Sequence, residues 1–374
     1  MASIIFIPLF AFIICCYMYF ADKYNTKYFN LFVFMALVIF SFLIGVRTNF
    51  GNDQITYMHS YVNQKLEYFE PIYSWLNILL FKYKQPFQVL FITVAFIEFY
   101  FLEKTAKVLN INYLFVVFFF FIFKYFAFFV NGLRQSIAIS ISMCAIVYFF
   151  YKRYLLFIFL LLIATGFHKS SLLFFILCPF VKLIKFSKKS WIDILFYIPL
   201  FFVFVFYNHI WDIILNLLQM FSRYLPNQFQ VIIAAFSVWK IELGTGLGVK
   251  LQILGYIMIL PNLLFYSKKD ALSQYLFFIF YLGILGKYFS GQNMNLSRLF
   301  LGMEYCGIFL SAKIMPYFLK DNILKIRNNL FMLGIFIYIF LFLYDSVKGV
   351  NTVGPTPYIW DLDFSLKKYF GKGF

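Results

Sequence analysis

The sequence predicts an all-α, polytopic integral membrane protein. Hydrophobic residues make up 63% of its 374 residues, charged residues only 13%, and its mean hydropathy is +0.84. Soluble globular domains do not have this balance. Long apolar runs follow one another without an intervening polar block, so we expect a single transmembrane domain over residues 1–374.

Twelve apolar runs have lengths suited to crossing a bilayer, for which a helix needs about 20 residues. They lie at 3–20, 29–46, 87–103, 113–130, 135–151, 154–167, 171–183, 191–207, 248–266, 273–289, 299–318 and 329–345. The apolar run 71–81 is too short to span, so we expect a re-entrant or interfacial helix there. The sequence thus predicts about twelve transmembrane helices with re-entrant or amphipathic loops on the outer face.

The positive-inside rule assigns each loop to a side of the membrane. With the N-terminus outside, twelve spans place the basic residues of the short loops on the inner side: Lys23, Lys27, Lys104, Lys107, Lys152, Arg153, Lys182, Lys185, Lys188, Lys189, Lys268, Lys269, Lys320, Lys325 and Arg327. The outer face then carries two long loops, 47–86 and 208–247, and the tail 346–374.

Several function classes lack support in the sequence. The net charge of +17 follows from these inner-side lysines, which set topology and contact anionic lipids, so it does not indicate nucleic-acid binding. The five cysteines lie inside apolar runs without metal-ligand spacing, and no His-Glu-x-x-His or Gly-x-Ser-x-Gly motif occurs. The glycine-rich stretch 244–250 is not followed by the residues of a nucleotide P-loop. We therefore expect no metal and no cofactor.

Four short polar islands interrupt the apolar chain. They are Arg47–Asp53, Asn131–Gln135, Phe167–Ser171 and Asn293–Arg298, and each follows an apolar run. Charged and amide side chains are costly at membrane depth, so such islands mark functional or topological positions. The topology derived above puts all four on the outer face.

The islands carry three arginines, Arg47, Arg134 and Arg298. Outer loops usually have no excess of positive charge. A guanidinium group is always ionised and binds phosphate oxygens through a two-pronged fork, so converging arginines could hold a pyrophosphate at the membrane surface. The alternative is that each arginine reaches a lipid headgroup or pairs with a single acid.

Two further island residues are candidates for proton transfer. The His168 imidazole titrates near neutral pH, and the Asp53 carboxylate lies in a Gly-Asn-Asp turn. Either could accept a proton from a substrate hydroxyl. Alternatively, His168 is hydrogen-bonded at a helix end and Asp53 forms a local salt bridge to Arg47. Asn131 and Gln135 could hold sugar hydroxyls or cap a helix.

The order of these residues resembles that in the EpsG family of exopolysaccharide polymerases, which are Wzy-like. Arg47-x-x-x-Gly51-x-Asp53-x-x-x-Tyr57, Arg134-Gln-x-Ile-Ala138 and His168-x-Ser170 are similar to three blocks of that family, and weaker similarity continues at Gly244–Gly248 and Leu296–Arg298. The resemblance covers about residues 40–310. One departure is Asn52, where the family more often has Thr or a small residue.

This resemblance implies a GT-C-like membrane glycosyltransferase without cofactor or metal. It would transfer a growing glycan from one undecaprenyl pyrophosphate to a sugar hydroxyl of another lipid-linked repeat unit, building O-antigen, capsule or exopolysaccharide. The reaction would take place on the periplasmic or outer face of the bacterial inner membrane. The lipid-linked donor and acceptor, membrane lipids and a separate chain-length regulator would be its partners, with no nucleic acid involved.

The resemblance also implies a role for each candidate residue. The arginines would stabilise the leaving pyrophosphate, and His168 or, as second choice, Asp53 would act as the catalytic base. Weaker candidates for sugar binding are Gln135, Tyr57 and Asn131.

Two other functions remain open. A lipid-linked glycan flippase or transporter would line a central cavity with charges at mid-span depth, and a membrane acyltransferase would place a histidine within a span. The depth and mutual distances of Arg47, Arg134, His168 and Arg298 distinguish these functions from a polymerase.

Overall fold

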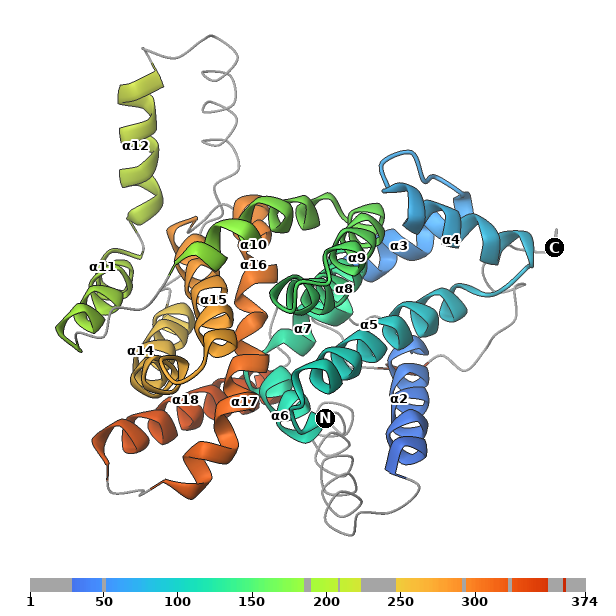
Figure 1. Cartoon of the computed structure of the whole chain (residues 1–374). Coiled ribbons are helices and arrows are strands. Elements are labelled where there is room, and N and C mark those ends of the chain that lie inside the picture. Colours follow the sequence, from blue (N-terminus) through green and yellow to red (C-terminus); the bar gives the residue numbers. More distant parts are fainter. Residues whose placement is uncertain are drawn as a thin grey trace. The chain divides into compact units, whose positions relative to one another are not determined.

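The computed structural model describes residues 29–48, 52–184, 190–207, 209–222, 247–290, 294–321, 325–348 and 359–360, some of their side chains excepted. These residues form helices almost throughout (Figure 1). One pair of two-residue strands accompanies the helices. The all-α prediction is therefore confirmed for the described part of the chain. The chain divides into two compact units, Met1–Cys178 with Phe342–Phe374, and Pro179–Leu341.

The first unit holds the elements from α2 to the start of α10. They are α2 (Phe29–Gly45), β1 (Arg47–Thr48), α3 (Asn52–Asn63), α4 (Pro71–Lys82), α5 (Phe87–Leu109), α6 (Tyr113–Ile122), α7 (Tyr125–Asn131), α8 (Leu133–Phe150), α9 (Tyr154–Phe167), the 3₁₀ helix η1 (Lys169–Leu172), α10 (Leu173–Leu183) and β2 (Ile359–Trp360). Helix α5 packs against α2 and α8, and α8 packs against α9.

The second unit continues from the later part of α10 into α18. Its elements are η2 (Ser190–Phe196), α11 (Tyr197–Phe206), α12 (Ile210–Ser222), α14 (Leu247–Ser267), α15 (Ala271–Phe289), α16 (Met294–Glu304), α17 (Cys306–Lys320) and α18 (Ile326–Lys348). Helix α15 packs against α14, α16 and α17.

Five helical stretches among the described residues are long and apolar enough to cross a membrane: Leu133–Phe150, Leu247–Ser267, Ala271–Phe289, Leu296–Lys320 and Ile326–Tyr344. Four shorter apolar helices accompany them, at Val33–Gly45, Tyr113–Ile122, Tyr154–Phe167 and Asp193–Phe206. The protein is therefore a polytopic membrane protein. The predicted count of about twelve spans stays a prediction, and the predicted span 3–20 lies outside the described residues.

The predicted span 113–130 is interrupted. Helix α6 ends before Phe123, and Lys124 adopts a left-handed conformation with φ 64° before α7 begins. Residues other than glycine rarely adopt this conformation, so packing must hold it in place. Phe123 is buried, and its ring lies 5.2 Å from that of Phe119. The break gives α7 its own direction, and α7 leads directly into the polar island at Asn131.

The predicted outer loops contain helices. In the loop 47–86, α3 and α4 precede α5, and α4 exposes Trp75 and Ile78 while burying Tyr73. This helix occupies the run expected to be re-entrant or interfacial. In the loop 208–247, α12 is followed by residues 223–246, which lie outside the described part. Strand β1 pairs antiparallel with β2, so Arg47 lies opposite Trp360. Two segments predicted on the same membrane face, the loop 47–86 and the tail 346–374, are thereby joined.

Candidate functional site

Arg134 forms a partly buried ion pair with Glu70. Arg134 is the second residue of α8, where a cation opposes the positive end of the helix dipole. Glu70 immediately precedes α4, and its Oε2 accepts a hydrogen bond from Arg134 Nη1 at 2.5 Å. The two side chains are 22% and 8% exposed. The Glu70 carboxylate therefore offsets the unfavourable position of the guanidinium.

Aromatic rings enclose the same guanidinium. Arg134 Cζ lies 4.4 Å from the ring centroid of Phe69 and 6.0 Å from that of Tyr57. Tyr73 completes the wall, with ring centroids 5.3 Å from Phe69 and 5.9 Å from Tyr57. Burial raises the pKa of Tyr57, while Arg134 and its hydrogen bond act in the opposite direction. Tyr57 thus stays a neutral hydroxyl that supports Arg134, and only 7% of its surface is exposed.

His168 lies where α9 ends and η1 begins. Its extended backbone, with φ −159°, places the imidazole over the start of η1, where Nδ1 accepts the backbone N–H of Ser170 at 3.2 Å. The Ser170 hydroxyl lies 2.8 Å from the same nitrogen. Because Nδ1 accepts a backbone N–H, a neutral ring carries its proton on Nε2. This tautomer is assigned from the hydrogen bonds.

One carboxylate connects the second and third polar islands. Glu70 Oε1 accepts the backbone N–H of Lys169 at 3.4 Å, while Glu70 Oε2 holds Arg134. Helices α4 and α9 approach closely beside this contact. Gly166 on α9 lies so near Ile72 on α4 that a Cβ at Gly166 would overlap the Ile72 side chain. The helix packing thus brings the His168 segment to Glu70.

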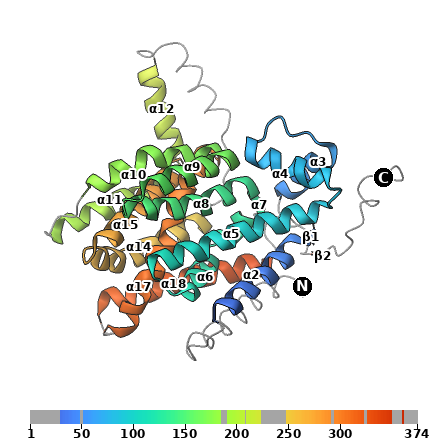
Figure 2. The same cartoon turned by 45° about the vertical axis from the view of Figure 1, so that its right-hand side comes forward.

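The first and second islands are also connected. The Asn131 side-chain oxygen at the end of α7 accepts the backbone N–H of Asp53 at 3.0 Å. This bond satisfies a donor in the first turn of α3, and so acts as a helix cap supplied from 78 residues away. Asp53 is half-buried on the same helix as Tyr57. Figure 2 shows α3 and α4 together at one end of α5, α8 and α9.

The structure thus gathers five of the eight predicted site residues in the first unit. Asp53, Tyr57, Asn131, Arg134 and His168 are connected through the contacts described above. They form, with Glu70, what we call the polar cluster.

The other three predicted residues are placed differently. Gln135 follows Arg134 on α8 but is only 5% exposed. Arg47 lies in β1, and its side chain is outside the described part, so its predicted salt bridge to Asp53 is untested. Arg298 is half-buried on α16, in the second unit. Its predicted convergence with Arg134 therefore stays a prediction.

Sequence reasoning missed two acidic residues. Glu70 precedes Pro71, which typically occupies the first turn of a helix, so a helix start could have been recognised there. In the second unit, Glu304 is 1% exposed and bonds Lys287 Nζ at 2.7 Å and the Tyr256 hydroxyl at 2.6 Å. An acid inside an apolar helix was a signal for this second buried ion pair.

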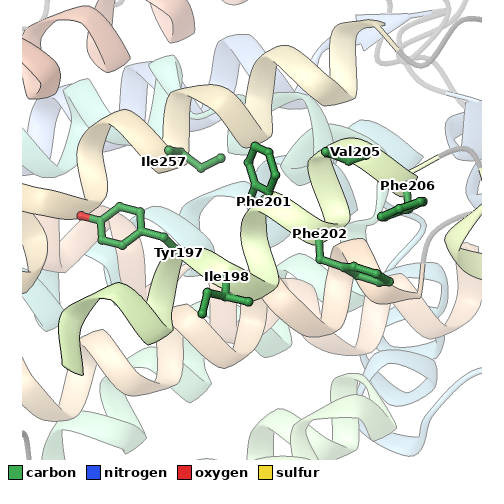
Figure 3. A pocket seen from close by; sticks show the side chains of 7 residues that line it. All are labelled: Tyr197, Ile198, Phe201, Phe202, Val205, Phe206 and Ile257. Atoms are coloured by element: carbon green, nitrogen blue, oxygen red, sulfur yellow. The ribbon is translucent and has the colours of Figure 1, made fainter. Parts of the chain in front are cut away.

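The second unit also has an open apolar groove of about 640 Å³ between α11 and α14. Figure 3 shows its lining, in which Phe201 faces Ile257 across the groove. Among the described residues, no three His, Cys, Asp or Glu side chains converge as metal ligands would.

Together, these features define a polytopic helical membrane protein with a partly buried polar cluster where several helices end. Comparison with known sequences identifies the group to which it belongs. The sequence model of the EpsG family matches residues 27–360, so the chain is a member of the EpsG family, a Wzy-like polymerase family. This membership indicates a role in polysaccharide biosynthesis. No curated protein and no solved structure matches the chain.

Proposed function

We propose that this protein is a glycosyltransferase that polymerises undecaprenyl-pyrophosphate-linked repeat units into O-antigen, capsule or exopolysaccharide. A glycan on one lipid pyrophosphate would be transferred to a sugar hydroxyl of another lipid-linked unit. Its membership of the EpsG family supports the reaction class. The observation that carries the proposal is the convergence of Arg134 and the His168 segment on one carboxylate, Glu70.

The polar cluster has the parts that this reaction needs. Charge develops on the leaving pyrophosphate, and the Arg134 guanidinium, which aromatic rings partly shield from water, would stabilise such charge. The start of α8 adds backbone N–H groups and the positive end of the helix dipole. Arg47 and Arg298 would add contacts to the same pyrophosphate. A side chain of the cluster would take the acceptor proton, and the resemblance implies His168 or Asp53 for this role.

Other parts of the chain would hold the remainder of the substrates. The apolar groove between α11 and α14 is suited to a polyprenyl chain, since its lining is almost wholly hydrocarbon (Figure 3). Tyr68, beside the cluster in sequence, is 90% exposed and could stack on a sugar. In the proposed orientation, the cluster faces the periplasm or cell exterior across the inner membrane, and a chain-length regulator would be an additional protein partner.

A lipid-linked glycan carrier is the alternative function. Glu98 favours it, because this acid is fully buried near the middle of α5, where it accepts a hydrogen bond from Ser136. A carrier uses ionisable groups at such depths. A buried acid hydrogen-bonded between two packed helices is also an ordinary packing element, so we favour the polymerase.

The test compares variants in cells that lack the gene. Arg134→Ala and His168→Ala should each replace the ladder of surface glycan by single repeat units, with unchanged amounts of protein in the membrane. Arg153→Ala is the matched control, because this exposed arginine lies at the other end of α8. Normal ladders from both site variants would refute the site. Loss of even the single-repeat glycan would point to the carrier.

A further inference from the structure

Glu70 is the carboxylate that contacts both Arg134 and the segment that carries His168. Its side chain makes no hydrogen bond to the start of its own helix α4, although a residue in this position often caps the helix. It reaches instead to Arg134 on α8 and to the backbone N–H of Lys169, next to His168. The carboxylate is therefore directed toward the place where the proposed donor and acceptor would meet.

The hydrogen bonds of His168 disfavour it as the proton acceptor. Its Nδ1 lone pair already accepts the N–H of Ser170, so in the neutral ring Nε2 carries the proton. Nε2 is then a hydrogen-bond donor and not a proton acceptor. To accept a proton at Nδ1, the ring would first have to break the cap of η1.

Arg134 links the availability of the Glu70 carboxylate to the binding of the donor. In the absence of substrate, the guanidinium is paired with Glu70 Oε2. A pyrophosphate carries more charge than one carboxylate and would draw the guanidinium toward itself. Glu70 Oε2 is then released from the guanidinium and can face the acceptor hydroxyl, and this happens only when the donor is bound.

We propose that Glu70 is the general base of the transfer, activated when the donor pyrophosphate draws Arg134 away from it. This inference rests on the proposed function. The acceptor hydroxyl oxygen bonds to the anomeric carbon as the bond from that carbon to the phosphate oxygen breaks. The electron pair of the broken bond leaves with the pyrophosphate, and the hydroxyl proton goes to Glu70.

The first experiment separates chemistry from binding with Glu70→Gln in the full-length protein. Glutamine keeps the shape and an oxygen that can accept the Lys169 N–H, but it cannot take a proton at neutral pH. The substrate is lipid-linked repeat unit extracted from cells that lack the gene. We expect turnover to fall by about 10²–10⁴-fold, the usual contribution of a general base. Undecaprenyl pyrophosphate should bind as tightly as to wild type, or more tightly, because Arg134 is released.

The matched control is Glu67→Gln, an exposed carboxylate three residues earlier, which should keep wild-type turnover. If the wild-type protein itself forms no polymer from these units, the proposed function fails. If wild type polymerises and Glu70→Gln stays within a few-fold of it, only the assignment of Glu70 fails.

A second set of measurements excludes a purely structural role. Wild-type turnover should decline at low pH as the base becomes protonated, and Glu70→Gln should lack that decline. Added formate should partly restore turnover to Glu70→Ala, since a small carboxylate can occupy the vacated space. Glu70→Asp, which keeps the carboxylate, should retain the acid decline even if the amide variant does not fold. Weakened binding of undecaprenyl pyrophosphate to Glu70→Gln, without formate rescue of Glu70→Ala, would overturn the proposal and leave Glu70 as a positioning residue.

Discussion

Arg134 and Glu70 form an ion pair across 64 residues of sequence and join the start of α8 to the start of α4. Both side chains are largely shielded from solvent, so each charge depends on the other. Buried ion pairs contribute little net stability, because desolvation cancels most of their attraction, but an unpaired buried charge is strongly destabilising. Stability alone therefore does not explain the pair, and we propose that its role is to hold a guanidinium for which a ligand competes.

A double-mutant cycle tests this energetic argument. Arg134→Met should lower the free energy of unfolding by about 3–5 kcal/mol, because Glu70 is left buried without a cation. Arg134→Met combined with Glu70→Gln should recover most of that loss. Thermal unfolding in detergent gives the four stabilities that the cycle needs, those of wild type, Arg134→Met, Glu70→Gln and the double variant. If the double variant is no more stable than Arg134→Met, the charges do not depend on one another.

Tyr57 predicts a difference in stability at alkaline pH. Burial raises the pKa of Tyr57 above its ordinary value of 10.0, partly opposed by Arg134. The pKa of Tyr57 is thus higher in the folded state than in the unfolded state. The contribution of Tyr57 to stability is therefore complete below pH 10.0 and is lost as the pH rises through the pKa of the folded state. Tyr57→Phe should therefore lose less stability than wild type when melting temperatures at pH 8 and pH 11 are compared. Identical losses would show that the hydroxyl does not titrate with folding.

The capping bond of Asn131 predicts that aspartate, but not alanine, can replace this residue without loss of stability. Its side-chain oxygen caps α3 through the N–H of Asp53, and losing such a cap costs about 1 kcal/mol. Asn131→Ala should be less stable and, because α3 carries Asp53 and Tyr57, less active. Asn131→Asp keeps the acceptor and should restore stability. An aspartate variant as unstable as the alanine variant would contradict the capping role; one that is stable but inactive would assign Asn131 to the sugar.

Much of the helical architecture could be predicted from the sequence. The apolar runs 135–151, 248–266 and 273–289 became α8, α14 and α15 to within a few residues. Such runs are strong local signals because a lipid-exposed backbone must satisfy its own hydrogen bonds. The break at Lys124 could not be predicted, since no glycine or proline marks it and tertiary packing decides it.

The candidate site was only partly predictable. Arg134 and His168 stood out because polar residues directly after an apolar run are rare, and topology placed them on one face. Glu70 did not stand out, since a carboxylate is ordinary in a polar loop and its role comes from distant contacts. Asn131 was recognised as a helix cap or sugar ligand, but the helix it caps lies in a different segment.

Variants of Arg298 test whether the second unit contributes to the binding of pyrophosphate. If it binds pyrophosphate through a two-pronged fork, Arg298→Lys keeps the charge but loses the geometry. Binding of undecaprenyl pyrophosphate should then weaken in the order wild type, Arg298→Lys, Arg298→Ala, and Arg153→Ala should bind as wild type. Unchanged binding in both Arg298 variants would remove this residue from the pyrophosphate site and leave it a role in the second unit alone.

The close contact at Gly166 predicts that the distance between α4 and α9 controls the activity of the polar cluster. A Cβ at this position would overlap Ile72, so Gly166→Ala should push α9 away from α4 and separate the Lys169 N–H from Glu70. We expect reduced polymer length and turnover with the protein still inserted in the membrane. Ile72→Ala removes the overlapping atoms, so the double variant should be more active than Gly166→Ala alone. Because both substitutions lie outside the polar cluster, such a recovery would show that the distance between the two helices sets the activity. Failure of Ile72→Ala to improve Gly166→Ala would mean that the close approach of α4 and α9 is not what positions His168.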